Sequence, residues 1–272
     1  MELRKLATVA AIACAAAVLP GSQSFAAGTD QALVSAVASA DRSPADVARD
    51  KYRHPLEALT FWQLRPKETV LEIWPSGGYW TEILAPYAKA TGGHYIAALS
   101  SPAHPLPSRF ANKTLYGDIT TTVFNKTSGP MVPAGSVDLV LTVRNLHDWV
   151  GTPGYPEKAF KDFYAALKPG GILGVVDHRA DPRPMLKDAS DGYVNTDYIV
   201  KLAKAAGFVL DAKSEINANP KDTKDHPFGV WTLPPSRQSA PSGQPANPSF
   251  DHTKYDAIGE SDRMTLRFRK PV

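Results

Sequence analysis

VLEIWPSGGYW, residues 70–80, is an apolar strand pattern that runs through a glycine turn into a helix pattern. Residues 69–74 predict the strand, which contains the acid Glu72, and residues 79–88 predict the helix. Between them, Gly77 and Gly78 form a tight loop. Glycine lets a backbone approach a ligand closely, and the start of a helix offers free N–H groups, so this turn is a candidate binding site.

The same alternation of short apolar runs and helical periods continues along the chain. Helices are predicted at residues 45–52, 56–64, 156–167 and 196–206, and further strands at 94–99, 114–116, 137–143, 172–177, 208–216 and 264–269. Alternating strands and helices imply right-handed crossovers. We therefore expect an α/β fold, Rossmann-like and doubly wound, with a mostly parallel seven-stranded sheet and an antiparallel last strand. Its ligand should lie beyond the carboxyl ends of the central strands.

The first residues have the order of a secretory signal peptide. Arg4 and Lys5 precede an uncharged, Ala-rich run from Leu6 to Leu19, and Ser24-Phe25-Ala26 has the small-residue pattern of a cleavage site. The run is shorter than a transmembrane helix requires, so a retained anchor is the weaker alternative, as is lipid attachment at Cys14. We expect residues 1–26 to be removed, leaving a periplasmic or secreted protein without a stable membrane span.

The remaining residues, 27–272, are enough for one large core and are interpreted as a single domain. N-terminal helices are expected within residues 29–64. Residues 217–261 form a long insertion, rich in Pro, Ser, Asp and Asn, which we expect to fold over the carboxyl edge of the sheet as a lid. Removal of the signal peptide lowers the formal net charge from +3 to +2, and the basic residues are scattered. No nucleic-acid partner is expected.

Several segments together resemble the class I S-adenosylmethionine-dependent methyltransferases. Residues 70–80 are similar to motif I of that family, residues 117–119 to the segment after its third strand, and residues 206–208 to its turn into the sixth strand. The most specific similarity is at residues 160–173, where a helix ends in Leu-Lys-Pro-Gly-Gly before a strand. The resemblance covers about residues 64–272 and extends to a group of predicted exported methyltransferases with unknown substrates.

The resemblance implies S-adenosylmethionine as cofactor, with Asp118 toward its adenine. The residues implied to bind it are Glu72, Trp74, Ser76, Gly77, Gly78, Asp118 and Asn145. Trp74 and Ser76 stand where most of the family has glycine, and Leu99 or Ser100 stands where an acid usually binds the ribose. These departures support a second hypothesis, an exported binding protein that keeps the fold without transfer activity. A nicotinamide-dependent oxidoreductase is a more distant alternative, because Gly-x-Gly-x-x-Gly is missing.

Polar residues at the exits of the fourth and fifth strands are the candidates for reaction chemistry. Methyl transfer to a hydroxyl or amine often requires removal of a proton, which a histidine of near-neutral pKa can accept. His147 is the first choice for this role and His178 the second, with Asp148 beside them; each histidine can instead be a loop residue bonded to the backbone. The expected methyl acceptor is a small molecule or an envelope component.

No metal site is predicted. The acids and histidines of the insertion lack the tight spacing of a metal site, and they are interpreted as loop caps and turns. They are Asp222, Asp225, His226, Asp251 and His252.

Overall fold

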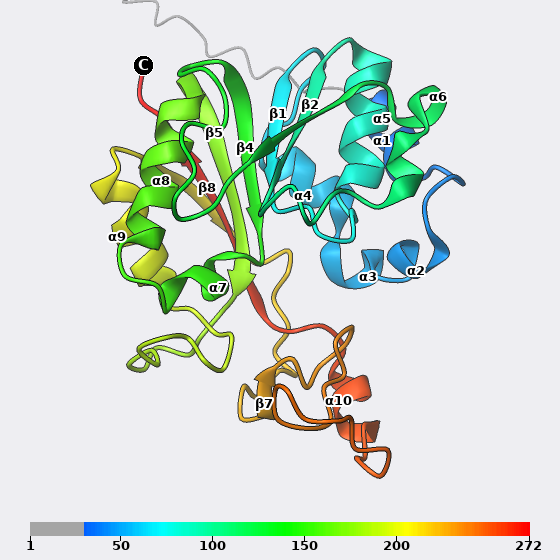
Figure 1. Ribbon diagram of the computed structural model, residues 1–272, viewed down its shortest axis with the longest axis vertical. Helices are drawn as coiled ribbons and strands as arrows, with labels where there is room; N and C mark the ends of the chain where they lie inside the picture. Colours follow the sequence, from blue (N-terminus) through cyan, green and yellow to red (C-terminus); the bar gives the residue numbers. More distant parts are fainter. Residues whose placement is uncertain (1–29) are drawn as a thin grey trace, which may run out of the picture.

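The computed structural model describes residues 30–272, so the expected signal peptide at residues 1–26 lies outside the described residues. A seven-stranded sheet with helices on both faces forms the body of the protein (Figure 1). Across the sheet the strands are β3 (Ile119–Val123), β2 (His94–Leu99), β1 (Thr69–Ile73), β4 (Val137–Val143), β5 (Leu167–His178), β8 (Arg263–Arg269) and β6 (Val209–Ser214). Strand β8 is antiparallel to both of its neighbours, and the other six strands share one direction. This confirms the Rossmann-like, mostly parallel sheet expected from the sequence.

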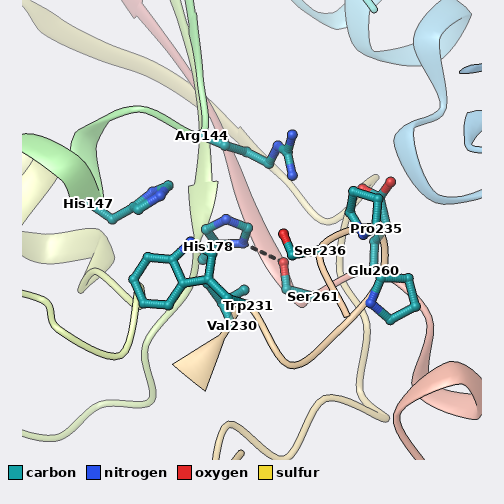
Figure 2. A pocket seen from close by; sticks show the side chains of 10 residues that line it. Arg144, His147, His178, Val230, Trp231, Pro235, Ser236, Glu260 and Ser261 are labelled. Atoms are coloured by element: carbon teal, nitrogen blue, oxygen red, sulfur yellow. Dashed lines mark hydrogen bonds between the residues drawn. The ribbon is translucent and has the colours of Figure 1, made fainter. Parts of the chain in front are cut away.

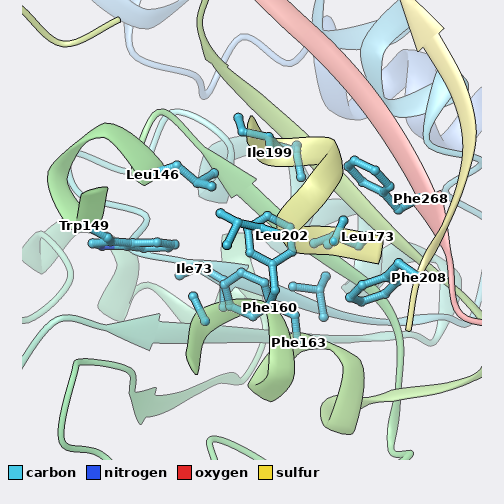
Figure 3. Close-up of a cluster of buried hydrophobic side chains, with 14 of the residues drawn as sticks. Ile73, Leu146, Trp149, Phe160, Phe163, Leu173, Ile199, Leu202, Phe208 and Phe268 are labelled. Atoms are coloured by element: carbon cyan, nitrogen blue, oxygen red, sulfur yellow. The ribbon is translucent and has the colours of Figure 1, made fainter. Parts of the chain in front are cut away.

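Two apolar clusters, one on each face of the sheet, form the core. Successive side chains of a strand point to opposite faces. Accordingly, Val70 packs in the cluster that contains Ile83, and Leu71 packs in the cluster that contains Phe160. The second cluster is drawn in Figure 3. The first face is covered by α1 (Gln31–Val37), α4 (Pro55–Phe61) and α5 (Thr81–Thr91), and the second by α7 (Leu146–Val150), α8 (Tyr155–Ala166) and α9 (Thr196–Ala205).

The helix expected at residues 45–52 is divided in two. Helix α2 (Pro44–Val47) begins with proline at its first position, as the sequence indicates, and α3 (Asp50–Arg53) follows after a turn. His54 then adopts a left-handed backbone (φ 44°) and separates α3 from α4. The N-terminal residues thus form short helical pieces, and Arg49, just before α3, and Arg53, its last residue, contribute to the site described below.

The third strand is not where the sequence analysis placed it, so that prediction was wrong. Residues 114–116 belong to helix α6 (Lys113–Tyr116), which follows the 3₁₀ turn η1 (Ser108–Ala111). The Asn112 side chain accepts a hydrogen bond from Leu115 N at 3.3 Å and caps this helix. Strand β3 comes afterwards, in the β-branched run Ile-Thr-Thr-Thr-Val. Asp118 therefore precedes the third strand and does not follow it.

The insertion at residues 217–261 lies beyond the carboxyl ends of β4 and β5, where a lid was expected (Figure 1). It contains β7 (Pro227–Val230) and α10 (Thr253–Ile258). Its anchor is the buried Asp222 carboxylate, which accepts hydrogen bonds from Tyr193 Oη at 3.0 Å and Asp262 N at 2.8 Å and lies 2.8 Å from His226 Nε2. Within residues 30–272, no helix has the length and apolar character needed to cross a membrane.

Candidate functional site

The glycine turn lies at the carboxyl end of β1. Trp74, Ser76 and Gly78 all have positive φ angles, of 49°, 50° and 88°. Trp74 N still donates to Ala98 O of β2 at 2.8 Å, so the chain leaves the sheet immediately after this residue. A left-handed backbone costs a tryptophan free energy, which the surrounding packing has to offset. The conformation determines where the indole ring lies.

The Trp74 indole lies across the edge of the sheet. Its Nε1 donates to Phe124 O, just after β3, at 2.7 Å, and its ring packs edge-on against Trp149 with 5.3 Å between centroids. Since β2 lies between β1 and β3, the indole passes over the carboxyl end of β2. That is the place where the family resemblance puts the adenosine of the cofactor.

A second aromatic residue covers the turn itself. A Cβ atom added at Gly78 would lie 2.3 Å from the Phe110 ring, and Arg109 Nη2 donates to Gly77 O at 2.5 Å. The cavity left beside the turn is about 90 Å³. Pockets for ligands the size of S-adenosylmethionine measure roughly 300 Å³ or more. The cavity beside the turn is therefore smaller than such a pocket, and a larger cavity of about 440 Å³ lies beyond Phe110, next to Leu99.

Two of the residues implied to bind the cofactor make internal contacts instead. The buried Glu72 carboxylate accepts Tyr95 Oη at 2.5 Å and Thr81 Oγ1 at 3.3 Å, and burial raises its pKa to about 7. Asn145 Nδ2 donates to Ile73 O at 2.8 Å and so ties the exit of β4 to the end of β1. Both residues line the small cavity beside the turn, and these contacts engage Glu72 Oε2 and Asn145 Nδ2.

The assignment of Asp118 to the adenine is corrected by the position of β3. Asp118 precedes β3 and so lies at the amino edge of the sheet, opposite the glycine turn. Its side chain is 85% exposed and pairs with Lys113 at 2.7 Å. Asp118 is thus a surface acid. The residues that do follow β3 at the carboxyl edge are Phe124 and Asn125, and Asn125 Nδ2 donates to Ser100 O at 3.2 Å.

The predicted histidines come together at the exits of β4 and β5. Their ring centroids are 4.9 Å apart. His147 Nδ1 lies 2.9 Å from the Asp177 carboxylate, which is fully buried and also accepts from Leu146 N and His178 N at 2.8 Å. Three donors hold Asp177 in place, and Asp177 in turn fixes the His147 ring. The Asp148 carboxylate is half-exposed and lies 3.5 Å from His147 Nε2.

The two histidines have opposite pKa shifts. Burial lowers the pKa of His147, but the neighbouring Asp177 carboxylate outweighs this effect and the pKa is raised above 6.5. Burial lowers the pKa of His178 well below its ordinary value, and the charges of His147 and Arg144 lower it further. His178 Nδ1 lies 2.5 Å from Ser261 Oγ. His147 is therefore the stronger base, and His178 stays neutral.

A cavity of about 160 Å³ opens beside these rings and is referred to below as the histidine pocket. Figure 2 shows its side chains, and the ring of Trp231, from the insertion, lies 6.0 Å from that of His147. The polar and aromatic residues that line it include Arg144, His147, His178, Trp231, Ser236 and Ser261.

The sequence analysis missed part of this pocket. It did not assign Ser261 or Glu260, which precede β8. An antiparallel last strand starts at the edge where the parallel strands end. The polar residues just before it could therefore have been predicted to lie at the site. Arg179 follows β5, but it does not line the pocket. Its guanidinium forms salt bridges with Asp262 and Glu215, each at 2.7 Å.

Among residues 30–272, His147, Asp177 and His178 offer possible metal-ligand atoms within 4.8 Å of one another. The Asp177 oxygens already accept three hydrogen bonds, and Nδ1 of each histidine is engaged. Positively charged Arg144 also lies close enough to depress the pKa of His178. The Nε2 atoms of the two histidines are therefore the donors left for a cation, and they lie beside the positive charge of Arg144.

The strand order, the glycine turn after β1 and a pocket at the carboxyl edge define the fold of the class I methyltransferases. No protein-family model and no curated protein matches the chain. Among solved structures, the [4+2]-cyclase SpnF is 16% identical, with 84% of this chain and 82% of that chain covered and a TM-score of 0.56. A SAM-dependent methyltransferase from Aquifex aeolicus is 13% identical, with 82% and 93% covered and a TM-score of 0.52.

A geranyl diphosphate methyltransferase, solved in complex with GPP and sinefungin, is also similar in structure. It is 13% identical, with 79% of this chain and 76% of that chain covered and a TM-score of 0.53. These likenesses establish the fold. Because methyltransferases and a cyclase share it, the fold does not by itself assign the reaction.

Proposed function

We propose that this chain is an enzyme of the methyltransferase fold that removes a proton from a small molecule in the histidine pocket, without S-adenosylmethionine at the glycine turn. One observation carries the proposal. His147 is buried, is aligned by Asp177 and lines a cavity, whereas Trp74 and Phe110 lie over the glycine turn and its neighbouring sheet edge. The proposal keeps the predicted role of His147 as proton acceptor, gives His178 a hydrogen-bonding role in place of the predicted one, and does not use the cofactor.

In this function the proton passes from the substrate to His147 Nε2. The Asp177 carboxylate then stabilises the imidazolium, as a carboxylate does when it orients a catalytic histidine. His178, held neutral by burial, is able to hydrogen-bond the substrate without competing for the proton. Trp231 and Pro235 form part of the wall contributed by the insertion, which limits the access of water to the reacting atoms.

S-adenosylmethionine-dependent methyl transfer to a small molecule or envelope component is the second candidate. The specific observation in its favour is the strand order with a glycine turn after β1, which the chain shares with solved SAM-dependent methyltransferases. For this function Trp74 would have to leave Phe124 O and swing away from the edge of β2.

Titration calorimetry with S-adenosylhomocysteine separates the two candidates. The wild-type protein should give no binding heat. Trp74→Gly should gain binding, because it removes the indole and glycine accepts the positive φ of this position. Trp231→Ala is the matched control, since it removes an aromatic ring from the other pocket and should gain nothing. Micromolar binding by the wild-type protein would favour methyl transfer instead.

Export to the periplasm or beyond is a further part of the proposal. It is supported by the basic start, the apolar run from Leu6 to Leu19 and the small residues at 24–26. Intact-mass measurement on protein from the envelope fraction should give a chain that begins close to Ala27. A mass that includes Met1 to Ala26 would contradict this expectation.

A further inference from the structure

Arg144 lies in the wall between the glycine turn and the histidine pocket, and lines both cavities. It follows β4 with a left-handed backbone (φ 61°), anchored by a hydrogen bond from its N to Val176 O at 2.8 Å. Figure 2 shows its guanidinium on the same side of the pocket as Ser236 and Glu260. Its Nε is buried, and no residue within 30–272 accepts a hydrogen bond from it.

Three other arginines close by share a single carboxylate. Glu260, which is 3% exposed, accepts from Arg49 Nε at 2.7 Å, Arg53 Nε at 3.2 Å and Arg263 Nη1 at 2.6 Å. These cations hold the pKa of Glu260 at about 2, against the effect of burial. With its oxygens committed to three guanidinium groups, Glu260 is not available to Arg144.

The hydrogen bonds of this region do not balance. Besides Glu260, the acids that face the arginines are Asp46, 3.5 Å from Arg49 Nη1, and Asp177, which is held by His147. Glu72 lies within the field of Arg53, and Asp148 within that of Arg144. None of these carboxylates accepts a hydrogen bond from Arg144 Nε. Buried charge without a partner is costly, and buried donors without acceptors indicate a missing ligand, ion or water. The unpartnered buried atoms are Arg49 Nη2, Arg53 Nη2, Arg144 Nε and Arg263 Nε.

We propose that the histidine pocket binds an oxyanion, the carboxylate or phosphate group of a small substrate, and that Arg144 is its principal anchor. This inference rests on the proposed function, whose substrate class it names. A guanidinium presents paired N–H groups that match two oxygens of either group. Ser236 and Ser261 place hydroxyl groups on the same pocket. The other end of the substrate then lies toward His147, the proton acceptor.

The size of the pocket agrees with a small ligand. Its volume of about 160 Å³ is below the roughly 300 Å³ of pockets that enclose drug-sized ligands, and it suffices for an acid group with a few further atoms.

Calorimetric titration of the purified full-length protein with inorganic phosphate and, separately, with succinate at constant ionic strength tests the inference. At least one of them should bind to the wild-type protein, and Arg144→Gln should weaken that binding about tenfold or more. Arg144→Lys, which retains the charge but loses the paired N–H groups, should fall between the two. Arg65→Gln is the control. It removes the same charge from an exposed position before β1, at the opposite edge of the sheet, and should bind like wild type.

Phosphate binding alone indicates a phosphate ester, and succinate binding alone indicates a carboxylic acid. The inference is overturned if neither probe binds, or if Arg144→Gln and Arg65→Gln bind as tightly as wild type. Circular dichroism checks the fold of each variant, and Arg144→Lys retains the test if the glutamine variant does not fold. Binding of S-adenosylhomocysteine to the wild-type protein would refute the proposed function and leave the anion titration to be judged on its own result.

Discussion

Trp74 changes what the glycine turn is able to accept. The sequence shows a tryptophan where most of the resembling family has glycine, and such a ring can either close a ligand pocket or form its wall. The structure distinguishes these cases, because the hydrogen bond from Nε1 to Phe124 O directs the ring across the sheet edge. The direction of the ring depends on Phe124, 50 positions away, so the local sequence around Trp74 cannot predict it.

The His147–Asp177 pair makes a prediction at the level of single residues. Asp177→Asn should lower the pKa of His147, because the carboxylate is what raises it against burial. Histidine signals followed by NMR across a pH titration measure this shift. Asp148→Asn is the control and should produce a smaller change, since Asp148 is half-exposed and farther from the ring. An unchanged or higher pKa in Asp177→Asn would contradict the assignment of His147 as the aligned base.

The same pair predicts a dependence of stability on pH. The folded-state pKa of His147 is raised, so its contribution is fully present below the unfolded value of about 6.5 and is lost as the pH rises through the folded value. Asp177→Asn should therefore cost more stability at about pH 5.5 than at about pH 8.5. Urea unfolding at both pH values measures the difference. An equal loss at the two values would show that only the hydrogen bond matters.

At the level of elements, the turn after β1 and the 3₁₀ turn η1 form one packed unit. Gly78→Ala should destabilise the protein by about 1–3 kcal/mol, because Gly78 has a positive φ and its Cβ would meet Phe110 at 2.3 Å. Gly77→Ala is the control, since nothing lies within 4 Å of a Cβ there, and should change stability by less than about 0.5 kcal/mol. Urea unfolding of both variants provides the measurement.

A double variant tests the cause of that loss. If contact with Phe110 is responsible for part of it, Phe110→Ala combined with Gly78→Ala should cost less than the sum of the two single changes. Strict additivity would assign the whole effect to the backbone conformation of Gly78.

The elements that the sequence predicted well are those whose signal is local. The strand at residues 94–99 and the strand at 137–143 have the predicted bounds, because a run of apolar residues ends in a turn on each side. The strand expected at 114–116 failed, since its three residues are too few to establish a period and the Asn112 cap decides for helix. Strand β5 is longer than the strand predicted at residues 172–177. It begins at Leu167, and its pairing with β4 shifts in register near that end.

The candidate site was predictable only in part, for a reason that concerns distance along the chain. His147 and His178 follow buried strands, so parallel pairing alone brings them to one edge. Arg53 and Glu260, in contrast, meet across 207 residues, and nothing in either local sequence indicates the other. The arginine cluster and the direction of the Trp74 indole are both of this second kind.

For the molecule as a whole, Glu260 joins the short helices near residue 50 to the insertion and to β8. The N-terminal arginines of residues 49–53 contact Glu260 at the end of the insertion, and Arg263 Nη2 donates to Tyr52 O at 2.6 Å. The insertion therefore closes onto the N-terminal helices as well as onto the sheet. Glu260 is the only described carboxylate that accepts from three of these arginines, so it should contribute strongly to the stability of the whole domain.

Glu260→Gln tests that contribution. The substitution keeps the size of the side chain and leaves the buried guanidinium groups of Arg53 and Arg263, and the partly exposed one of Arg49, without their shared carboxylate, which should cost about 3–5 kcal/mol at neutral pH. The pKa of Glu260 is about 2 in the folded protein, below the ordinary 4.5, so its stabilisation is present above pH 4.5 and is lost as the pH falls toward 2. The difference in unfolding free energy between wild type and variant should accordingly shrink over this range. Urea unfolding at several pH values measures this difference. Glu215→Gln is the control, because the Glu215 side chain is 70% exposed and its substitution should cost less than about 1 kcal/mol of stability. A loss for Glu260→Gln no larger than that of Glu215→Gln would mean that water, and not Glu260, satisfies the arginine cluster.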